Sequence, residues 1–256
     1  MNWQGKVVLL TGASSGIGEG IAIALAKRGA VLGLLARREN LLTELAQKCE
    51  LAGGKAITLA CDVTDAEAVQ NAADILREEF DNIDILIANA GIGGNNKETR
   101  DLQPEAVGTV IDINLMGAVN SVHAVLPDML TRGSGQLVAV SSLAGIRGLP
   151  KSAAYSASKA GMTAFFESVR LDVQNKGVSV TIIQPGFIRT PLTEGRTNNM
   201  PFLMELDDAI PHFINAIERG KKFSAFPWQL ATIVRLGKIM PAWLYDRVAG
   251  RASYRT

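Results

Sequence analysis

Tyr155 and Lys159 are the two residues whose types and spacing most directly suggest acid–base chemistry. They lie in the small-residue run Ser-Ala-Ala-Tyr-Ser-Ala-Ser-Lys-Ala, which opens a segment of helical periodicity over residues 153–175. Residues four apart share one face of a helix, so the ammonium would lie one turn from the phenol. A free phenol loses its proton at pH ~10, and a fixed positive charge beside it lowers its pKa toward the neutral range. The alternative is an ordinary tyrosine and an ordinary surface lysine.

The elements that would position this pair alternate between strand-like and helix-like segments. Strands are expected over residues 7–10, 31–36, 56–60, 83–88, 135–140, 178–183 and 223–226, and helices over residues 19–28, 38–51, 65–80, 104–130 and 153–175. The strands are mostly continuous apolar runs, which is typical of strands buried on both faces of a parallel sheet. The pattern predicts an α/β fold with a doubly wound parallel sheet, a Rossmann-like three-layer α/β/α sandwich, in a single domain over residues 1–256.

The amino-acid composition argues against several classes of function. The net charge of +1 gives no reason to expect a nucleic-acid partner. The two cysteines, Cys49 and Cys61, lack metal-ligand spacing, and the two histidines lie far apart, so no metal site is expected. The chain starts without a basic, cleavable leader, and no apolar run reaches the ~20 residues of a transmembrane helix. The sequence therefore predicts a cytoplasmic protein without a transmembrane segment.

A glycine-rich segment follows the first predicted strand, where a doubly wound sheet binds its ligand. Gly12, Gly16 and Gly18 have the spacing Gly-x-x-x-Gly-x-Gly, with Ser14, Ser15 and Ile17 between them. Glycines let the backbone turn tightly and approach a pyrophosphate, which then lies at the N-terminus of the following helix. Placed between a strand and a helix, the segment predicts a dinucleotide site.

The end of the second predicted strand indicates which dinucleotide is bound. An acidic residue there would bond the ribose hydroxyls of NAD, whereas arginine suits the additional phosphate of NADP. The chain has Arg37 and Arg38 and no acid before Glu39. Because a guanidinium matches phosphate geometry, we expect Arg37 to contact the 2′-phosphate, assisted by Arg38 and Ser14, and NADP(H) to be preferred. The alternative is two solvated arginines at the start of a helix.

Polar residues also follow the third, fourth and fifth strands. Asp62 and Val63 end the third strand, where Asp62 could accept from an adenine amino group or cap the next helix, for which Asp65 is the other candidate N-cap. Asn89, Ala90 and Gly91 end the fourth strand, and Gly91 would allow close approach of the cofactor. Ser142 ends the fifth strand, and a short loop joins it to the helix that carries Tyr155. Asn114 lies within the long predicted helix before that strand.

Together these motifs resemble the short-chain dehydrogenase/reductase family over about residues 5–193. The resemblance rests on the Thr-Gly-x-x-x-Gly-x-Gly turn, Asn89-Ala90-Gly91, Asn114, Ser142, Tyr155-x-x-x-Lys159, and Pro185-Gly186 followed by Ile188 and Thr190. It implies an oxidoreductase that interconverts a carbonyl and a secondary alcohol with NADP(H).

The resemblance also implies a role for each of these residues. Tyr155 would protonate the substrate oxygen, Lys159 would lower the pKa of Tyr155 and hold the nicotinamide ribose, and Ser142 would hydrogen-bond the substrate oxygen. Asn114 would hold a water that links Lys159 to solvent. Four further residues would position the nicotinamide ring: Pro185, Gly186, Ile188 and Thr190. The rival interpretation is a non-catalytic NADP-sensing protein on the same fold, although all four catalytic positions are filled.

Beyond residue 191 the resemblance no longer carries individual residues. Residues 190–215 are expected to form a substrate loop or lid, whose apolar tip at residues 200–204 favours a hydrophobic or acyl-like small-molecule substrate, or else packs in the core. Residues 227–256 are expected to form a helical extension with helices at 228–239 and 242–248.

The partners of this extension and of the chain itself stay open. Asp246 is the single acid in this part of the chain. It is outnumbered by seven basic residues: Lys221, Lys222, Arg235, Lys238, Arg247, Arg251 and Arg255. With Trp228, Trp243 and Tyr245, they fit a peripheral membrane contact, packing beside the active site, or packing on a sister subunit. A homodimer or homotetramer is expected through the helix at residues 153–175.

Overall fold

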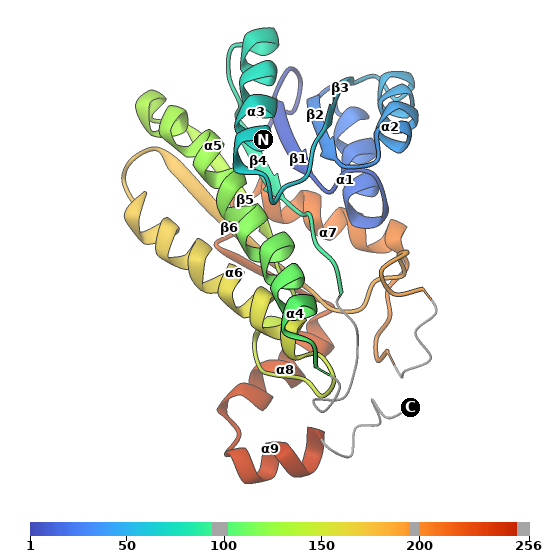
Figure 1. Cartoon of the computed structure of the whole chain (residues 1–256), viewed down its shortest axis with the longest axis vertical. Helices are drawn as coiled ribbons and strands as arrows, with labels where there is room; N and C mark the ends of the chain where they lie inside the picture. The colour runs from blue at the N-terminus through green and yellow to red at the C-terminus, as the bar shows by residue number, and fades with distance from the viewer. Residues whose placement is uncertain (94–101, 195–199, 250–256) are drawn as a thin grey trace.

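The computed structural model describes residues 1–93, 102–194 and 200–249 and has a seven-stranded sheet in which every neighbouring pair is parallel (Figure 1). The strand order is β3-β2-β1-β4-β5-β6-β7. The strands are β1 (Val7–Thr11), β2 (Val31–Ala36), β3 (Lys55–Ala60), β4 (Ile85–Ala88), β5 (Gly135–Val140), β6 (Val178–Pro185) and β7 (Phe223–Phe226). The order reverses between β1 and β4, which is where doubly wound sheets bind ligands beyond the carboxyl ends of the strands. The predicted fold class is confirmed.

Burial explains why most of these segments are strands. Every residue of β1, β2 and β4 is buried, because helices cover both faces of the sheet at these strands. β3 and β7 are different: they lie at the two edges of the sheet, and each has one buried residue, Leu59 and Phe226. The expectation of two-sided burial is therefore wrong for these two strands, because an edge position leaves part of each in contact with solvent.

Helices form a layer on each face of the sheet. α1 (Gly16–Ala26), α2 (Glu39–Leu51) and α7 (Leu206–Glu218) share one hydrophobic core with the sheet. α3 (Ala66–Phe80), α5 (Gly117–Arg132) and α6 (Ala153–Asp172) share the other, on the opposite side of the sheet (Figure 1). Asp65 caps α3, since its Oδ1 accepts a hydrogen bond from the Ala68 amide at 3.0 Å.

The long helical region before β5 is interrupted. α4 (Pro104–Ile111) and α5 are joined by a π-helical segment, η2 (Asp112–Met116), which contains Asn114. The region Pro104–Arg132 is long and apolar enough to span a membrane by length and composition alone. Here it packs against α3, α6 and β4, as a core helix of a folded domain does.

The segment expected to be a lid contains an unpredicted helix. α7 begins at Leu206 and buries Ile210, Phe213 and Ile217 in the core beside α1. The last ten residues of the 190–215 interval thus belong to a core helix. Gly195, Asn198 and Asn199 of the same interval lie outside the described residues.

The described part of the chain ends in two helices, α8 (Trp228–Ile239) and α9 (Ala242–Ala249), close to the predicted bounds. They lie at one end of the molecule, at the bottom of Figure 1. Leu230 and Ala231 are buried on the inner side of α8, whereas α9 buries none of its residues. Arg251 and Arg255 lie outside the described residues.

Candidate active site

A cavity of about 370 Å³ lies at the carboxyl ends of the strands, around the point where the strand order reverses. Nearly all of the predicted site residues line it: Gly12, Ser14, Ser15, Gly16, Ile17, Arg37, Arg38, Asp62, Val63, Asn89, Ala90, Gly91, Ser142, Tyr155, Lys159, Pro185, Gly186, Ile188 and Thr190. Gly18 and Asn114 are not part of the lining. The topology therefore brings together residues from the ends of six strands, β1 to β6, and from the first two turns of α6.

The glycine-rich turn is packed so closely that side chains would not fit. Gly12 has a φ of +65°, and a Cβ there would lie 2.6 Å from the Cα of Ala90. A Cβ on Gly18 would lie 2.2 Å from the carbonyl oxygen of Gly12. Gly18 therefore allows α1 to pack against the turn, which explains why it does not face the cavity.

Thr11 and Asn89 fix the ends of β1 and β4 relative to each other. The hydroxyl oxygen of Thr11 accepts hydrogen bonds from the amides of Asn89 at 3.0 Å and Ala90 at 3.1 Å. The Asn89 side chain donates in return to the carbonyls of Thr11 at 3.0 Å and Gly12 at 3.1 Å. Asn89 thus has a positioning role in the turn, in addition to the cavity-lining place predicted for it.

The two arginines after β2 have different partners. Arg38 Nη2 donates to the hydroxyl oxygens of Ser14 and Ser15, each at 2.9 Å, across the mouth of the glycine-rich turn. Arg37 Nη1 lies 3.5 Å from Oδ2 of Asp62 in an exposed ion pair. Both guanidinium groups line the same end of the cavity.

Asp62 forms a turn with Thr64. Its Oδ1 accepts from the Thr64 amide at 3.0 Å and the Thr64 hydroxyl at 2.9 Å. Partial burial acts to raise the pKa of Asp62, but these hydrogen bonds and the charge of Arg37 outweigh it and lower the pKa. Since Asp65 caps α3, the alternative that Asp62 is the helix cap is wrong.

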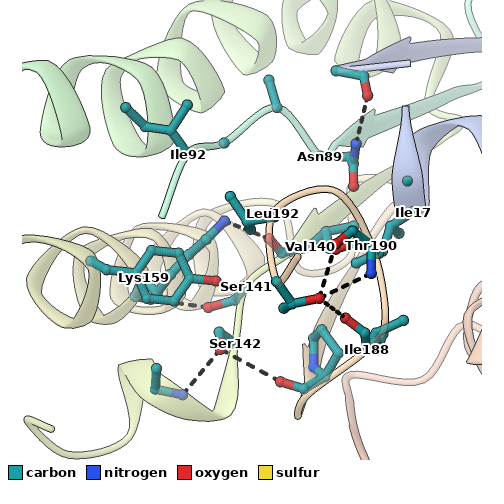
Figure 2. A pocket seen from close by; sticks show the side chains of 18 of the residues that line it. Ile17, Asn89, Ile92, Val140, Ser141, Ser142, Lys159, Ile188, Thr190 and Leu192 are labelled. Atoms are coloured by element: carbon teal, nitrogen blue, oxygen red, sulfur yellow. Dashed lines mark hydrogen bonds between the residues drawn. The ribbon is translucent and has the colours of Figure 1, made fainter. Parts of the chain in front are cut away.

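Ser142 follows β5 after one intervening residue, Ser141. Its Oγ accepts a hydrogen bond from the Ala144 amide at 3.1 Å, which caps the 3₁₀ helix η3 (Leu143–Gly145), and donates to the Pro185 carbonyl at 3.5 Å (Figure 2). η3 packs directly on α6, because a Cβ on Gly145 would lie 2.7 Å from the carbonyl carbon of Lys159. This contact brings the end of β5 to the first turns of α6.

Lys159 is almost entirely buried on α6, one turn after the half-buried Tyr155. Its Nζ donates to the Val140 carbonyl at 2.9 Å, as Figure 2 shows, and lies 3.7 Å from the sulfur of Met162. Burial lowers the pKa of Lys159 from 10.5 to about 8. Its ammonium is thus held beneath the same cavity wall to which Tyr155 and Ser142 contribute.

Asn114 lies behind the cavity wall. Its Oδ1 accepts from the Ile92 amide at 2.7 Å, and its Nδ2 donates to the Ile92 carbonyl at 3.0 Å and to Ser158 Oγ at 2.9 Å. The side chain is therefore already engaged by the segment after β4 and by α6. The sequence analysis missed Ser158 as its partner.

The structure adds a second residue that the sequence analysis missed, Arg147, in the loop between η3 and α6. Its guanidinium donates to the carbonyls of Gly237 and Met240, the latter at 2.8 Å, and lies 3.7 Å from the centre of the Tyr245 ring. The Tyr245 hydroxyl donates to the Gly148 carbonyl at 2.7 Å. The loop that joins Ser142 to Tyr155 is thereby attached to α8 and α9. A single loop arginine has no periodicity that would reveal this contact.

The remaining lining is mostly apolar and extends to α8. It includes Leu149, Phe187, Leu192, Met200, Leu230 and Val234. Among residues 1–93, 102–194 and 200–249, no group of three or more histidine, cysteine, aspartate or glutamate side chains is placed to hold a metal ion.

Comparison with known proteins gives consistent matches. Residues 6–201 match the family described as short chain dehydrogenase. The chain is 44% identical over 246 residues to an uncharacterized oxidoreductase of Myxococcus xanthus, covering 96% of this chain and 97% of that protein. It is 38% identical over 196 residues to 11-beta-hydroxysteroid dehydrogenase 1A of Arabidopsis thaliana, covering 76% of this chain and 56% of that protein.

Solved structures agree with these matches. The crystal structure of a 3-ketoacyl-ACP reductase from Sinorhizobium meliloti superposes with a TM-score of 0.77 at 30% identity, covering 86% of this chain and 96% of that one.

Proposed function

Since the chain belongs to the short-chain dehydrogenase family, we propose that it is an NADP(H)-dependent oxidoreductase that interconverts a carbonyl group and a secondary alcohol. The observation that carries the proposal is one cavity with two chemically distinct ends. The glycine-rich turn and two arginines line one end, and Ser142, Tyr155 and Lys159 line the other.

The residues at the first end fit a dinucleotide. In the turn before α1, the glycines lack side chains, so the backbone of the turn packs closely against neighbouring backbone. The N-terminus of α1 favours binding of a pyrophosphate at this turn. Arg38 donates to the hydroxyls of Ser14 and Ser15, and the exposed Arg37, paired with Asp62, lines the same cavity, so both guanidinium groups could reach a 2′-phosphate. This arrangement supports the preference for NADP(H) over NAD(H). The nicotinamide of the bound cofactor supplies or accepts the hydride.

Tyr155 is proposed as the general acid in reduction and the general base in oxidation. The ammonium of Lys159, one turn away and shielded from water, favours the phenolate of Tyr155 and would also hold the nicotinamide ribose. A Cβ on Gly91 would lie 3.5 Å from Lys159 Nζ, so the absence of a side chain there leaves room beside the ammonium. Ser142 Oγ would donate to the substrate oxygen as negative charge develops on it.

The segment after β6 is proposed to hold the nicotinamide ring through Pro185, Gly186, Ile188 and Thr190. Thr193 gives this segment its shape: its Oγ1 accepts from the Thr190 amide at 3.0 Å and donates to the Ile188 carbonyl at 2.8 Å. Such local hydrogen bonds make the carbonyls and amides that face the cavity rigid.

A hydrophobic or acyl-like ketone or aldehyde is the proposed substrate class. Six apolar side chains of the lining, contributed by the segments after β5 and β6 and by α8, support it, because they favour an apolar substrate portion. The matched hydroxysteroid dehydrogenase and ketoacyl reductase are named for hydrophobic or acyl substrates.

We also propose a homodimer or homotetramer that uses α6. Ala153, Ala157, Ala160 and Ala164 form an exposed stripe on this helix, which allows close helix–helix approach. Light scattering after size-exclusion chromatography should give a multiple of the chain mass for the wild-type protein and a smaller mass for Ala160→Arg.

The deciding experiment is NADPH oxidation, with NADH in parallel, against hydrophobic ketones and aldehydes that include long-chain 3-keto compounds. Turnover with a preference for NADPH supports the proposal. Tight NADPH binding without turnover of any member of the panel would favour the rival interpretation, a non-catalytic NADP-sensing protein.

A further inference from the structure

The two C-terminal helices expose an unusual set of large apolar side chains. We define the C-terminal apolar face as Trp228, Ile233, Leu236, Ile239, Trp243 and Val248, whose exposed fractions range from 52% to 80%. Scattered exposed hydrophobic residues are normal, but six within 21 consecutive positions (228–248) form a concentration of the kind that marks an interaction surface.

Helix geometry places the α8 members of this face together. At about 100° per residue, Trp228, Ile239, Leu236 and Ile233 fall within an arc of roughly 140°. The opposite side of α8 faces the body of the protein: Leu230 and Ala231 are buried there, and Leu230 and Val234 line the cavity. Packing against the protein core therefore does not explain why the outward-facing residues of α8 are apolar.

The charged side chains of α8 and α9 are almost all positive, and Arg235 falls about 20° from Trp228 around α8. Between residues 228 and 249 the chain carries Arg235, Lys238 and Arg247 against a single acid, Asp246, and all four side chains are exposed. Exposed tryptophans and aliphatic residues flanked by cations are the features of helices that lie in the interface of an anionic bilayer.

The helix pair is firmly attached to the body of the protein. Arg147 donates to the last carbonyls of α8 and packs on Tyr245 of α9, and Tyr245 donates to Gly148. The face therefore lies at one end of the molecule, where α8 and α9 are found (Figure 1). The inner side of α8 lines the cavity.

We propose that the C-terminal apolar face docks on the surface of a bilayer that contains anionic phospholipids. A second copy of the chain is the competing occupant. A two-fold interface would bring the same patch of each copy together and so gather two copies of Arg235, Lys238 and Arg247 in one contact, where the helix pair offers Asp246 as its one acid per copy. An anionic surface complements those charges instead. The proposal does not depend on the catalytic activity.

The test uses the full chain and flotation with vesicles of phosphatidylcholine containing about 30% phosphatidylglycerol. The wild-type protein should float with these vesicles at low salt, less at high salt, and much less with pure phosphatidylcholine. Neutralising two cations in Arg235→Gln/Lys238→Gln should weaken binding roughly thirty-fold, since each cation near an anionic surface contributes on the order of fivefold. The matched control is Lys55→Gln/Lys176→Gln, which removes two exposed cations elsewhere and should bind as the wild type does.

The apolar part of the face is tested by Ile239→Ser/Trp243→Ser, with the exposed Leu51→Ser as control. We expect the first variant to lose binding and the control to keep it, with NADPH affinity unchanged in both. Equal flotation of all variants, or no flotation of the wild type, would overturn the proposal. So would sedimentation velocity without vesicles in which Ile239→Ser/Trp243→Ser lowers the oligomer mass, because the face would then be an interface between copies.

Discussion

Lys159 Nζ donates a hydrogen bond to the main-chain carbonyl of Val140 at 2.9 Å, from an almost fully buried side chain. The bond joins the first turns of α6 to the end of β5, shortly before Ser142. The ammonium on which the proposed chemistry depends is thus held by the strand that carries Ser142.

This buried ammonium predicts a pH-dependent stability. Below about pH 8, Lys159 is protonated in the folded and unfolded chain, so the folded state bears the full cost of burying the charge. Between about pH 8 and 10.5 the folded chain releases this proton while the unfolded chain keeps it, so stability from this group rises with pH. Lys159→Met has no such titration.

Urea unfolding at several pH values checks this prediction. The free energy of unfolding of Lys159→Met minus that of the protein with Lys159 should fall by on the order of 3 kcal/mol across the window. Both proteins carry Tyr155→Phe, because Lys159 also influences the titration of Tyr155, and the difference then cancels the titration of the other groups. A difference that is constant with pH would mean that burial does not lower the pKa of Lys159.

The arginines after β2 predict the cofactor preference. Arg37→Asp should reduce the preference for NADPH over NADH at least tenfold, because it replaces a phosphate partner by a repelling carboxylate. Arg38→Ala should raise the KM for NADPH and leave the KM for NADH nearly unchanged. Steady-state kinetics with both cofactors measures each effect. An unchanged preference in both variants would contradict the assignment.

Gly12 and Gly133 allow a matched test of the glycine-rich turn. Both have a φ of +65°, but a Cβ on Gly12 would lie 2.6 Å from Ala90, whereas one on Gly133 meets nothing within 4 Å. Either change to alanine should cost about 1–2 kcal/mol of stability from backbone strain. Only Gly12→Ala should also displace the turn and lose NADPH affinity, which fluorescence titration would detect. Equal NADPH affinity in the two variants would argue against cofactor binding at the turn.

Arg147 predicts an effect on substrate binding from outside the cavity. Arg147→Ala removes hydrogen bonds to the end of α8 that contribute about 2 kcal/mol, together with the contact to Tyr245. Because α8 lines the cavity, the KM for a hydrophobic ketone should rise while NADPH affinity stays unchanged, and Arg147→Lys should restore it in part. Limited proteolysis should cut the C-terminal helices faster in Arg147→Ala. An unaltered KM and digestion pattern would refute this role.

Much of the fold could be predicted from the sequence, because the local residue patterns agree with the secondary structure that forms. Apolar runs that give way to the polar residues Arg37 and Ser141 mark β2 and β5 at their observed bounds, and Pro241 separates α8 from α9 as expected. α7 was missed because Pro211 lies within it and an aspartate pair fills its first turn, features that also suit a loop. Its helical state is supported by burial against α1 rather than by local signals.

The candidate site was predictable where short motifs follow strands, as with Gly12, Asn89, Ser142 and Tyr155. It was not predictable where a residue acts through a distant backbone contact. Arg147 contacts α8 at a residue 90 positions later in the sequence, and the Asn114 side chain forms hydrogen bonds with Ile92 and Ser158. Such pairings depend on how α6, η2 and the C-terminal helices pack, which no local pattern encodes.

The most direct test of the central claim is the rate of NADPH oxidation by Tyr155→Phe with the best ketone found for the wild type. Removing the hydroxyl should lower kcat by about 10²–10⁴-fold, because no group remains to protonate the substrate oxygen, while NADPH affinity and thermal stability stay close to wild type. A variant with wild-type kcat would contradict the assignment of Tyr155 as the acid–base group.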